Sequence, residues 1–573
     1  MRQLQLLLVA GILVWLQVVL PQLLLADQKD EKLVITADEI RAMQVLKISE
    51  VLNRIPGIKA GETSVSIRGS GNVKVFLDGR SINDPTSFSG SVKWSMISLD
   101  TIKKIEVIKG GGGTAYGDNT GGGVIVITTK SAQRLGGTVG GYWGDNGQKN
   151  ASLNLSGRKN NVSASLTSGY ESYDGFTVNG DKTRRRLGTR IDYRASQNIS
   201  LFLSGEYNDE KKGLRGYPEK RTPNSRKNYD DWSWLFGQRY GDMTGRTYYS
   251  TSRTVSEDPD KDLYASLEVV KAGQSLQAPF ALPFFGRVES GAGYEWRRAS
   301  GNRFTTTDEE QAWFFLSKTL CKDATPWSFF MGIRTNYYSN FSNTLNPEVK
   351  AGYSRDSFSF ELSASRSSNL PTFRQRFYES SVTRPNPDLQ MERAMNYALS
   401  FSVMPDSSLS IDASVFHRDI TDRITYVRKP DNTGRYENFG QVTYQGAEVS
   451  VTWALSDIVE VSPSYSYLHA LNEETGYWLP AKPFHTVLME VVIQPFTGFS
   501  FRTTAKFTGK VYTNAGNTST IPGYTVVDAR ADYSLDKLTF YCDIDNLLDE
   551  RYLYVDGYDA PPREFVVGMN YTF

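Results

Sequence analysis

The 573-residue sequence has few of the residues that build metal clusters, disulfide frameworks or helical membrane bundles. Two Cys and three His cannot supply a Cys-rich zinc module or a disulfide scaffold. Only residues 4–25 form an apolar run long enough for a membrane-spanning helix, which excludes a bundle of such helices. A net charge of +1 gives no general attraction to nucleic acid. Aromatic residues make up 12% of the chain and charged residues 22%, so wholesale disorder is excluded as well.

The first 26 residues have the pattern of a secretory signal peptide. Arg2 precedes a Leu- and Val-rich core, and Ala26 stands before a charged stretch that begins at Asp27. Leu24 occupies a position where cleavage prefers a small residue, so an uncleaved membrane anchor is the alternative. Loss of residues 1–26 removes one basic side chain and no acidic one, leaving 63 side chains of each sign. The pattern predicts a protein that leaves the cytoplasm.

Residues 38–130 have a mixed pattern that predicts a small α+β domain. Residues 46–55 carry apolar side chains at helical spacing, and the Pro-Gly pair that follows ends a helix. Asp78-Gly79 lies between two β-prone segments and is typical of a tight hairpin turn. Four short strands are expected, at 65–69, 73–77, 103–109 and 124–128.

Residues 131–573 alternate apolar and polar side chains in runs of about ten residues, separated by turn signals. Such runs predict the strands of a transmembrane β-barrel, because only a closed barrel pairs every backbone group of a strand inside lipid. The 443 residues divided over 22 strands give about 20 each, which is a spanning strand plus a connection. A soluble all-β repeat protein, such as a propeller, is the alternative.

An ordered set of motifs resembles the TonB-dependent outer-membrane receptors. In the first part of the chain the motifs are EKLVITA (31–37), SEVLNRIPGI (49–58), VSIRGSGNVKVFLDGRSIN (65–83) and the Gly-rich segment 102–130. Further motifs follow at 370–378, 386–392, 443–451 and 546–552, before a terminal aromatic strand. Departures are Lys109, where the family usually has Arg, and Gly111, where it often has Pro. The resemblance implies a 22-stranded antiparallel barrel (131–573) whose lumen holds an N-terminal α+β plug domain (38–130).

Segment 27–37 is similar to the family's TonB box, with Lys32, Leu33, Val34, Ile35, Thr36 and Ala37 as the expected TonB contacts. A short β-prone strand without Pro can add to the sheet edge of a partner through main-chain hydrogen bonds. The resemblance implies that TonB, energised by ExbB and ExbD, pulls on this segment. The plainer interpretation is that residues 31–37 are the first strand of the plug.

The alternation also predicts which barrel carboxylates face the lumen. If Tyr397 and its alternate neighbours face lipid, Glu392 has the opposite parity, and the same argument turns Glu448 inward. In the family two plug cations pair with two barrel-wall carboxylates, and by resemblance these are Arg68 and Lys109 facing Glu392 and Glu448. Two unrelated, hydrated lumen glutamates are the alternative.

The glycine run 110–113 fits a dinucleotide fingerprint nominally, but the segment after it is a poor helix. Tight plug turns are the preferred interpretation. Pro85, Phe88 and Tyr116 are the ligand contacts expected on the plug. Arg215 and Tyr217 are those expected in the long loop, whose cations and aromatic groups suit an anionic iron chelate.

The same loop cations could instead bind the phosphates of lipopolysaccharide. An acidic run at 257–262 could bind Ca²⁺, although a solvated loop is the preferred interpretation and no resident metal or cofactor is expected.

The sequence contains no recognisable pair of a catalytic nucleophile and a general base, so no enzyme activity is expected. The resemblance implies a monomeric outer-membrane transporter for a scarce metal chelate, with a ferric siderophore as the first choice. Cobalamin is the close alternative, because the compact barrel and the LVITA-type box suit cobalamin receptors equally well. A passive porin is disfavoured because it needs neither a plug nor a TonB box.

Overall fold

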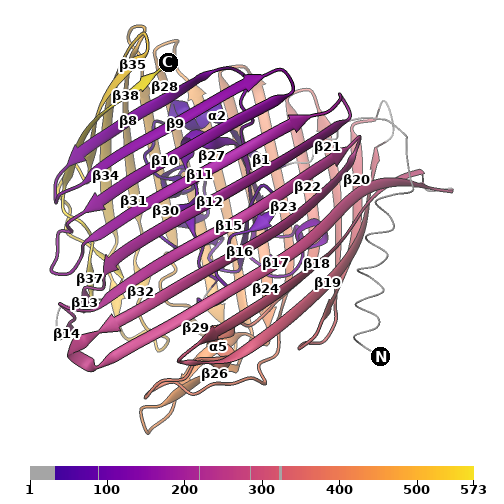
Figure 1. The fold of residues 1–573 in the computed structure, drawn as a ribbon, viewed down its shortest axis with the longest axis vertical. Helices are drawn as coiled ribbons and strands as arrows, with labels where there is room; N and C mark the ends of the chain where they lie inside the picture. Colours follow the sequence, from indigo (N-terminus) through magenta and orange to yellow (C-terminus); the bar gives the residue numbers. More distant parts are fainter. Residues whose placement is uncertain (1–31, 88–89, 218–219, 284–285, 322–324, 556) are drawn as a thin grey trace.

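The computed structural model describes residues 32–87, 90–217, 220–283, 286–321, 325–555 and 557–573. The predicted signal peptide (1–26), the start of segment 27–37 and Phe88 lie outside the described residues. The described chain forms a closed β-barrel that surrounds a smaller domain, the plug (Figure 1). No helix within these ranges is long and apolar enough to cross a membrane.

The plug is built on a five-stranded sheet of mixed direction. The order of its strands is β1 (Leu33–Thr36), β6 (Ile102–Lys109), β7 (Gly123–Thr129), β4 (Val73–Leu77) and β5 (Arg80–Ser81). A separate hairpin consists of β2 (Ile58–Ala60) and β3 (Val65–Ile67). The helices of the plug are α2 (Ala37–Met43), α3 (Ile48–Asn53), α4 (Gly113–Tyr116), η1 (Trp94–Met96) and η2 (Leu99–Thr101).

Local sequence signals explain these elements. The Thr36 side chain caps α2 in a reciprocal capping box with Glu39, which satisfies two backbone donors at the helix start. Asp78 and Gly79 have φ of 51° and 94°, as the tight turn between β4 and β5 requires. The predicted helix and the four predicted plug strands are confirmed within a few residues of the expected bounds.

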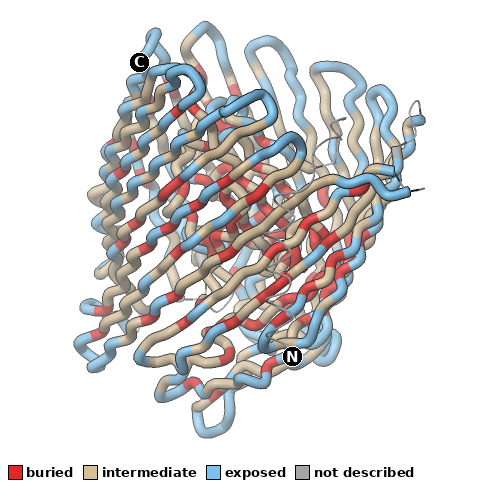
Figure 2. The backbone as a smooth tube through the Cα atoms, turned by 45° about the vertical axis from the view of Figure 1, so that its right-hand side comes forward, coloured by how far each residue is buried: buried red, intermediate tan, exposed pale blue. Residues whose placement is uncertain are grey.

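The plug has an apolar core of its own. Its buried side chains run from Ile35 to Ile127 and include none from the barrel. Val51, Leu52, Val75 and Ile105 are completely inaccessible to solvent. In Figure 2 buried positions lie inside the barrel and also along the strands of the wall around it. The apolar core of the plug is therefore separate from the barrel wall, although Leu46 of the plug packs against the wall residues Tyr142, Tyr541 and Val566.

The barrel has 22 strand positions, as predicted, with β29 and β30 sharing one position beside β28. Its first strands are β8 (Gly136–Gly144), β9 (Lys149–Lys159), β10 (Val162–Tyr173), β11 (Lys182–Arg194), β12 (Ile199–Gly213), β15 (Arg226–Tyr240), β16 (Met243–Asp258), β17 (Leu263–Leu282), β18 (Gly286–Gly301), β19 (Phe304–Cys321), β20 (Trp327–Tyr338) and β21 (Thr344–Arg355). The remaining strands are β22 (Phe358–Asn369), β23 (Glu392–Asp406), β24 (Leu409–Thr421), β27 (Val442–Ala454), β28 (Val459–Asn472), β29 (Tyr477–Trp478), β30 (His485–Ile493), β31 (Phe499–Thr508), β34 (Tyr524–Leu535), β35 (Leu538–Asp545) and β38 (Glu564–Thr572). Hydrogen bonds between β38 and β8 close the barrel.

The connections at the two ends of the barrel differ in length. Two residues separate β9 from β10, β15 from β16 and β21 from β22. The opposite end carries long loops, including 370–391, 422–441 and 546–563. These loops contain η3 (Pro259–Lys261), α5 (Phe373–Phe377) and the hairpins β13 (Gly216–Tyr217) with β14 (Lys220–Arg221), β25 (Ile424–Arg428) with β26 (Gly434–Asn438), β32 (Val511–Tyr512) with β33 (Thr520–Ile521) and β36 (Leu553–Val555) with β37 (Tyr558–Asp559). In outer-membrane barrels short turns face the periplasm and long loops face outward.

The predicted side-chain alternation is confirmed on β23. The outward Tyr397 and Phe401 are exposed at the surface, while Glu392, Ala394 and Asn396 are buried toward the lumen.

Candidate functional site at the plug and barrel interface

Glu448 of β27 joins the plug to the barrel wall. Its Oε2 accepts hydrogen bonds from Arg68 Nη2 at 3.1 Å, Lys109 Nζ at 3.0 Å and Ser414 Oγ at 3.1 Å. Arg68 also lies over the Phe416 ring at 4.4 Å. All four groups of this Glu448 cluster (Arg68, Lys109, Ser414 and Glu448) come from separate elements, so the cluster fixes the plug in one orientation. The predicted contacts of Arg68 and Lys109 with Glu448 are present.

Burial and charge explain the chemistry of the cluster. Burial lowers the pKa of Lys109, and the neighbouring Glu448 carboxylate partly offsets this effect. Gly57 makes room for the carboxylate, because a Cβ atom at this position would lie 1.7 Å from Glu448 Oε1. Gly57 also has a φ of 73°, a conformation that favours glycine.

Glu392 does not pair with either plug cation, and this part of the predicted latch is wrong. Its Oε2 accepts from Asn72 Nδ2 of the plug at 2.8 Å and from Asn369 Nδ2 at 3.1 Å. Its Oε1 accepts from the backbone N–H of Ile424 in an outer loop at 2.8 Å. Both plug cations converge on one carboxylate, so Glu392 is left to bind the plug through a neutral amide. Its inward orientation was predicted correctly, but its partner was not.

Two further contacts of the plug were not predicted. Glu348 accepts hydrogen bonds from the backbone N–H groups of Gly112 at 3.2 Å and Thr114 at 3.4 Å. Asp118 is buried and accepts from Thr344 Oγ1 at 2.9 Å and from the Tyr338 hydroxyl. The glycines at 110–112 all have positive φ, and the backbone of this turn lies against the barrel wall. This agrees with the interpretation that the glycine run permits a tight turn of the plug.

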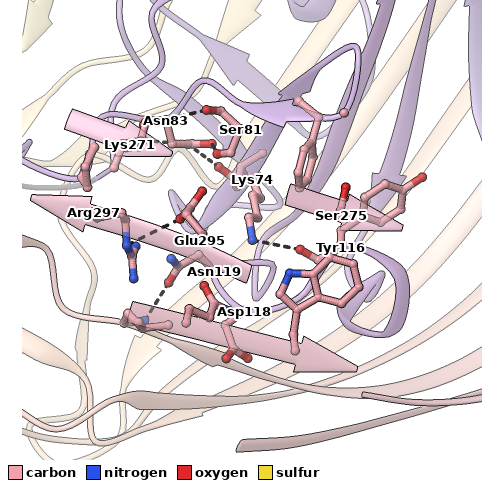
Figure 3. A pocket seen from close by; sticks show the side chains of 18 of the residues that line it. Lys74, Ser81, Asn83, Tyr116, Asp118, Asn119, Lys271, Ser275, Glu295 and Arg297 are labelled. Carbon is pink, nitrogen blue, oxygen red and sulfur yellow. Dashed lines mark hydrogen bonds and ion pairs between the residues drawn. The ribbon is translucent and has the colours of Figure 1, made fainter. Parts of the chain in front are cut away.

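A cavity of about 510 Å³, here called the outer cavity, lies between the plug and the wall formed by β16 to β20. Tyr116 and Pro85, two of the expected ligand contacts, line it together with Trp313 and Tyr248 of the wall. Figure 3 shows that plug and wall side chains meet across this space.

Four cations in the outer cavity donate hydrogen bonds to backbone carbonyls. Lys74 Nζ donates to Tyr116 O at 2.9 Å, and Lys271 Nζ donates to Ser81 O at 3.0 Å (Figure 3). Arg246 Nε donates to Asp78 O at 2.8 Å, and Arg334 Nη1 to Ala115 O at 3.3 Å. Within the described residues, none of the four forms an ion pair with a carboxylate. Burial lowers the pKa of Lys74 to about 8, with the nearby Arg334 adding to the effect.

Arg215 and Tyr217 do not line the outer cavity, so the structure does not bring them together with Tyr116 and Pro85. Arg215 Nη2 donates to Asp559 O at 3.2 Å, and the Tyr217 ring packs on Tyr558 with centroids 4.8 Å apart. These contacts tie two outer loops together. A ligand contact at this pair stays a prediction.

The expected TonB-binding segment forms β1, the edge strand of the plug sheet. Its register with β6 pairs Leu33 with Val107 and Thr36 with Lys104. Ile35 is buried in the plug core, while Leu33 and Val34 are exposed at 43% and 40%. The expected strand is confirmed over residues 33–36, which form the first strand of the plug, whereas Ala37 begins α2. An edge strand presents main-chain groups to which another strand can pair.

Two acidic side chains of the run at 257–262 have hydrogen-bond partners within the protein. Asp258 accepts from Lys261 Nζ at 2.6 Å, and Asp260 accepts from Asn224 at 3.0 Å. Within the described ranges, no group of three or more His, Cys, Asp or Glu side chains is arranged to hold a metal ion.

Several known proteins resemble this chain in sequence. The Vitamin B12 transporter BtuB of Photobacterium profundum is 24% identical over an aligned length of 592 residues, and the alignment covers 94% of this chain and 92% of that protein.

Solved structures resemble it in fold. The siderophore receptor PirA from Acinetobacter baumannii superposes with a TM-score of 0.80 at 16% identity, covering 95% of this chain and 98% of that one. A mutant of the ferric enterobactin receptor PfeA from Pseudomonas aeruginosa, in complex with enterobactin, gives a TM-score of 0.80 at 17% identity, with coverages of 96% and 100%.

Two family descriptions match the chain in the order of its two bodies. Residues 26–124 match the TonB-dependent Receptor Plug Domain, and residues 117–547 match the TonB dependent receptor-like β-barrel. Together with the plugged 22-strand barrel, these matches assign the chain to the TonB-dependent receptor family of the outer membrane.

Proposed function

We propose that this receptor takes up an anionic metal chelate, with a ferric siderophore as the substrate class. The observation that supports it most directly is the set of four cations in the outer cavity that form no ion pair among the described residues: Lys74, Arg246, Lys271 and Arg334. Tyr116, Tyr248 and Trp313 line the same cavity. Cations beside aromatic faces suit a ligand that is both anionic and conjugated, as catecholate iron complexes are.

The energy for uptake comes from the periplasmic side in this proposal. The outer membrane holds no ATP, so TonB, energised by ExbB and ExbD, would pair with the open edge of β1 and pull it. The plug would yield because separate polar contacts, such as the Glu448 cluster, hold it in the barrel and can break one at a time. In this scheme the protein binds and moves its cargo without a catalytic step, and it acts as a monomer.

The outer surface of the barrel fits a lipid environment. Exposed apolar side chains such as Trp143, Met331 and Phe540 point outward, and we propose that they contact lipid tails. The cationic outer loops would contact the phosphates of lipopolysaccharide.

Cobalamin uptake is the second candidate, and the relative named as a vitamin B12 transporter favours it. A corrinoid lacks the concentrated negative charge of a ferric tris-catecholate, so the two candidates predict different salt dependence. Binding of the anionic chelate should weaken as ionic strength rises, because salt screens its attraction to the cavity cations.

Tryptophan fluorescence of the purified receptor would discriminate the two. Trp313 lines the cavity, and the Arg334 guanidinium lies 4.1 Å from its ring, so a ligand bound there should quench its emission. We expect quenching by ferric enterobactin and none by cyanocobalamin, with the quench reduced in Trp313→Phe. Quenching by cyanocobalamin alone would overturn the siderophore assignment. Growth of a deletion strain on the same two compounds tests uptake in cells.

A further inference from the structure

A second cavity, of about 880 Å³, lies on the other side of the plug hairpin formed by β4 and β5. This inner cavity is bounded by the plug segments 96–103 and 128–134 and by the wall strands β9 to β12. Its lining includes Asn161 and Gln197, which lie in the short periplasmic turns. The outer cavity instead reaches Gln375 and Ile424, which lie in the long outer loops. The two cavities therefore approach opposite ends of the barrel.

The two cavities share a boundary at two residues, Thr128 of the plug and Arg190 of β11. Arg190 Nη1 donates to Asp78 Oδ2 at 3.2 Å and to Thr129 Oγ1 at 3.1 Å, so its guanidinium bridges the barrel wall and the plug hairpin. A plug-to-wall ion pair thus lies where the two spaces meet.

Both partners of this ion pair are held in place. Asp78 accepts from the backbone N–H of Thr129 at 2.9 Å and from its hydroxyl at 2.6 Å. The Arg190 guanidinium pairs with Asp192 at 2.7 Å and lies 3.9 Å from the centre of the Phe202 ring. The Arg190 side chain is therefore held by wall residues as well as by the plug, so it can keep its position at the boundary between the two cavities.

The charge of the lining differs between the cavities. The outer cavity is lined by eight Lys or Arg and seven Asp or Glu side chains, which nearly balance. The inner cavity is lined by nine Lys or Arg against three Asp or Glu, so its lining is strongly cationic. An anionic cargo would meet increasing positive potential as it moves toward the periplasm.

We propose that the Asp78–Arg190 ion pair is the internal barrier between the outer and inner cavities, and that Arg190 selects anionic cargo at the crossing. This inference rests on the proposed uptake of an anionic chelate. An anion can take the place of Asp78 beside Arg190, and Asp78 then keeps its hydrogen bonds from Thr129. A cationic cargo could displace Arg190 from Asp78, but it would then enter an inner cavity whose lining is strongly cationic.

Conductance of the purified full-length receptor in planar lipid bilayers, with KCl as the only probe, tests the barrier. We expect the wild-type protein to be closed and Arg190→Ala to open a steady conductance, because truncation joins the two cavities. Arg190→Lys keeps a cation at the crossing and is expected to remain closed. The open variant should prefer chloride over potassium in a KCl gradient, because the inner lining is cationic.

Arg530→Ala is the matched control. Arg530 also pairs with the acid two residues along its strand, Asp532, at 3.0 Å, and its guanidinium lies 4.3 Å from the Tyr541 ring. It lines neither cavity, so this variant is expected to remain closed.

Three results would overturn the inference: a closed Arg190→Ala whose barrel is folded, equal conductance in Arg530→Ala, or a cation-selective open state. The assay contains no chelate, so its outcome is independent of which substrate the receptor takes.

Discussion

Replacing Glu448 by Ala removes the one carboxylate that two plug cations share. In the native structure the side chain is 4% exposed and accepts from Arg68, Lys109 and Ser414. The substitution leaves two cations in a buried site without their counter-charge. The plug should therefore lose stability relative to its dissociated or locally opened states, whereas the barrel, closed by its own hydrogen bonds, should not.

The size of the effect follows from what each cation keeps. Removing one partner of a buried ion pair costs about 3–5 kcal/mol. Arg68 retains Ser414 and the carbonyl of Lys109, and Lys109 retains the carbonyl of Pro56 at 2.7 Å. The loss should therefore lie near the lower limit, at about 3 kcal/mol. Because 1.4 kcal/mol is a factor of ten, amide exchange through plug opening should accelerate by about 100-fold.

Hydrogen exchange of the full-length receptor, followed by peptide, provides the assay. Peptides from β3, β4 and β6 report on the plug, and peptides from β16 to β20 provide the internal reference. Glu392→Ala is the matched control, because Glu392 is also buried and faces the plug but binds the neutral Asn72 amide. Losing this hydrogen bond to a carboxylate should cost about 1.5 kcal/mol, or roughly tenfold in exchange. Plug protection that is unchanged in Glu448→Ala, or lower in Glu392→Ala than in Glu448→Ala, would refute the reasoning.

Three other expectations concern the plug. Val34→Pro should abolish TonB-dependent uptake of ferric enterobactin while leaving binding intact, because Pro removes a main-chain hydrogen-bond donor from β1. Val34→Ala keeps this donor and should still transport. Transport by both variants would contradict the proposal that TonB pairs with β1. The affinity for ferric enterobactin should fall as the pH rises through about 8, the pKa of Lys74, because this side chain then loses its charge. The ratio of the wild-type affinity to the Lys74→Met affinity should fall over the same pH range. A ratio that stays constant would show that Lys74 does not contribute to binding. Gly57→Ala should lower the hydrogen-exchange protection of the plug, as Glu448→Ala does, because the new Cβ displaces the Glu448 carboxylate. Plug protection equal to that of the wild type would show that the carboxylate moves aside without cost.

The parts of the fold that follow from local rules could be predicted. Side-chain alternation depends only on strand geometry, so it correctly turned Glu392 and Glu448 toward the lumen. The Asp78-Gly79 turn was legible because few residues tolerate its backbone angles. Asn396 has the same parity as Glu392 on β23 and is buried as well.

The pairing of groups across the interface could not be predicted in the same way. Whether Glu392 meets a cation or an amide depends on which plug atom lies opposite, and strand parity carries no such information. The Arg190–Asp78 contact links residues 112 positions apart, so no local pattern predicts it. The Arg-x-Asp spacing of Arg190 and Asp192 on one face of β11 could have indicated the ion pair between these two residues. The positions of Arg215 and Tyr217 could not be predicted either, because the fold of a long outer loop is set by its contacts with other loops.

The direction of β1 has a mechanical consequence. β1 runs antiparallel to β6, and its first residue pairs with Val107, whereas its last pairs with Lys104, nearer the periplasmic end where β6 begins. A periplasmic tug applied ahead of Leu33 therefore first loads the end of the strand that lies deeper in the barrel. The pairs then separate in succession, as in a zipper, rather than sliding past one another all together. Because only one rung carries the load at any moment, a modest force suffices to peel this strand away.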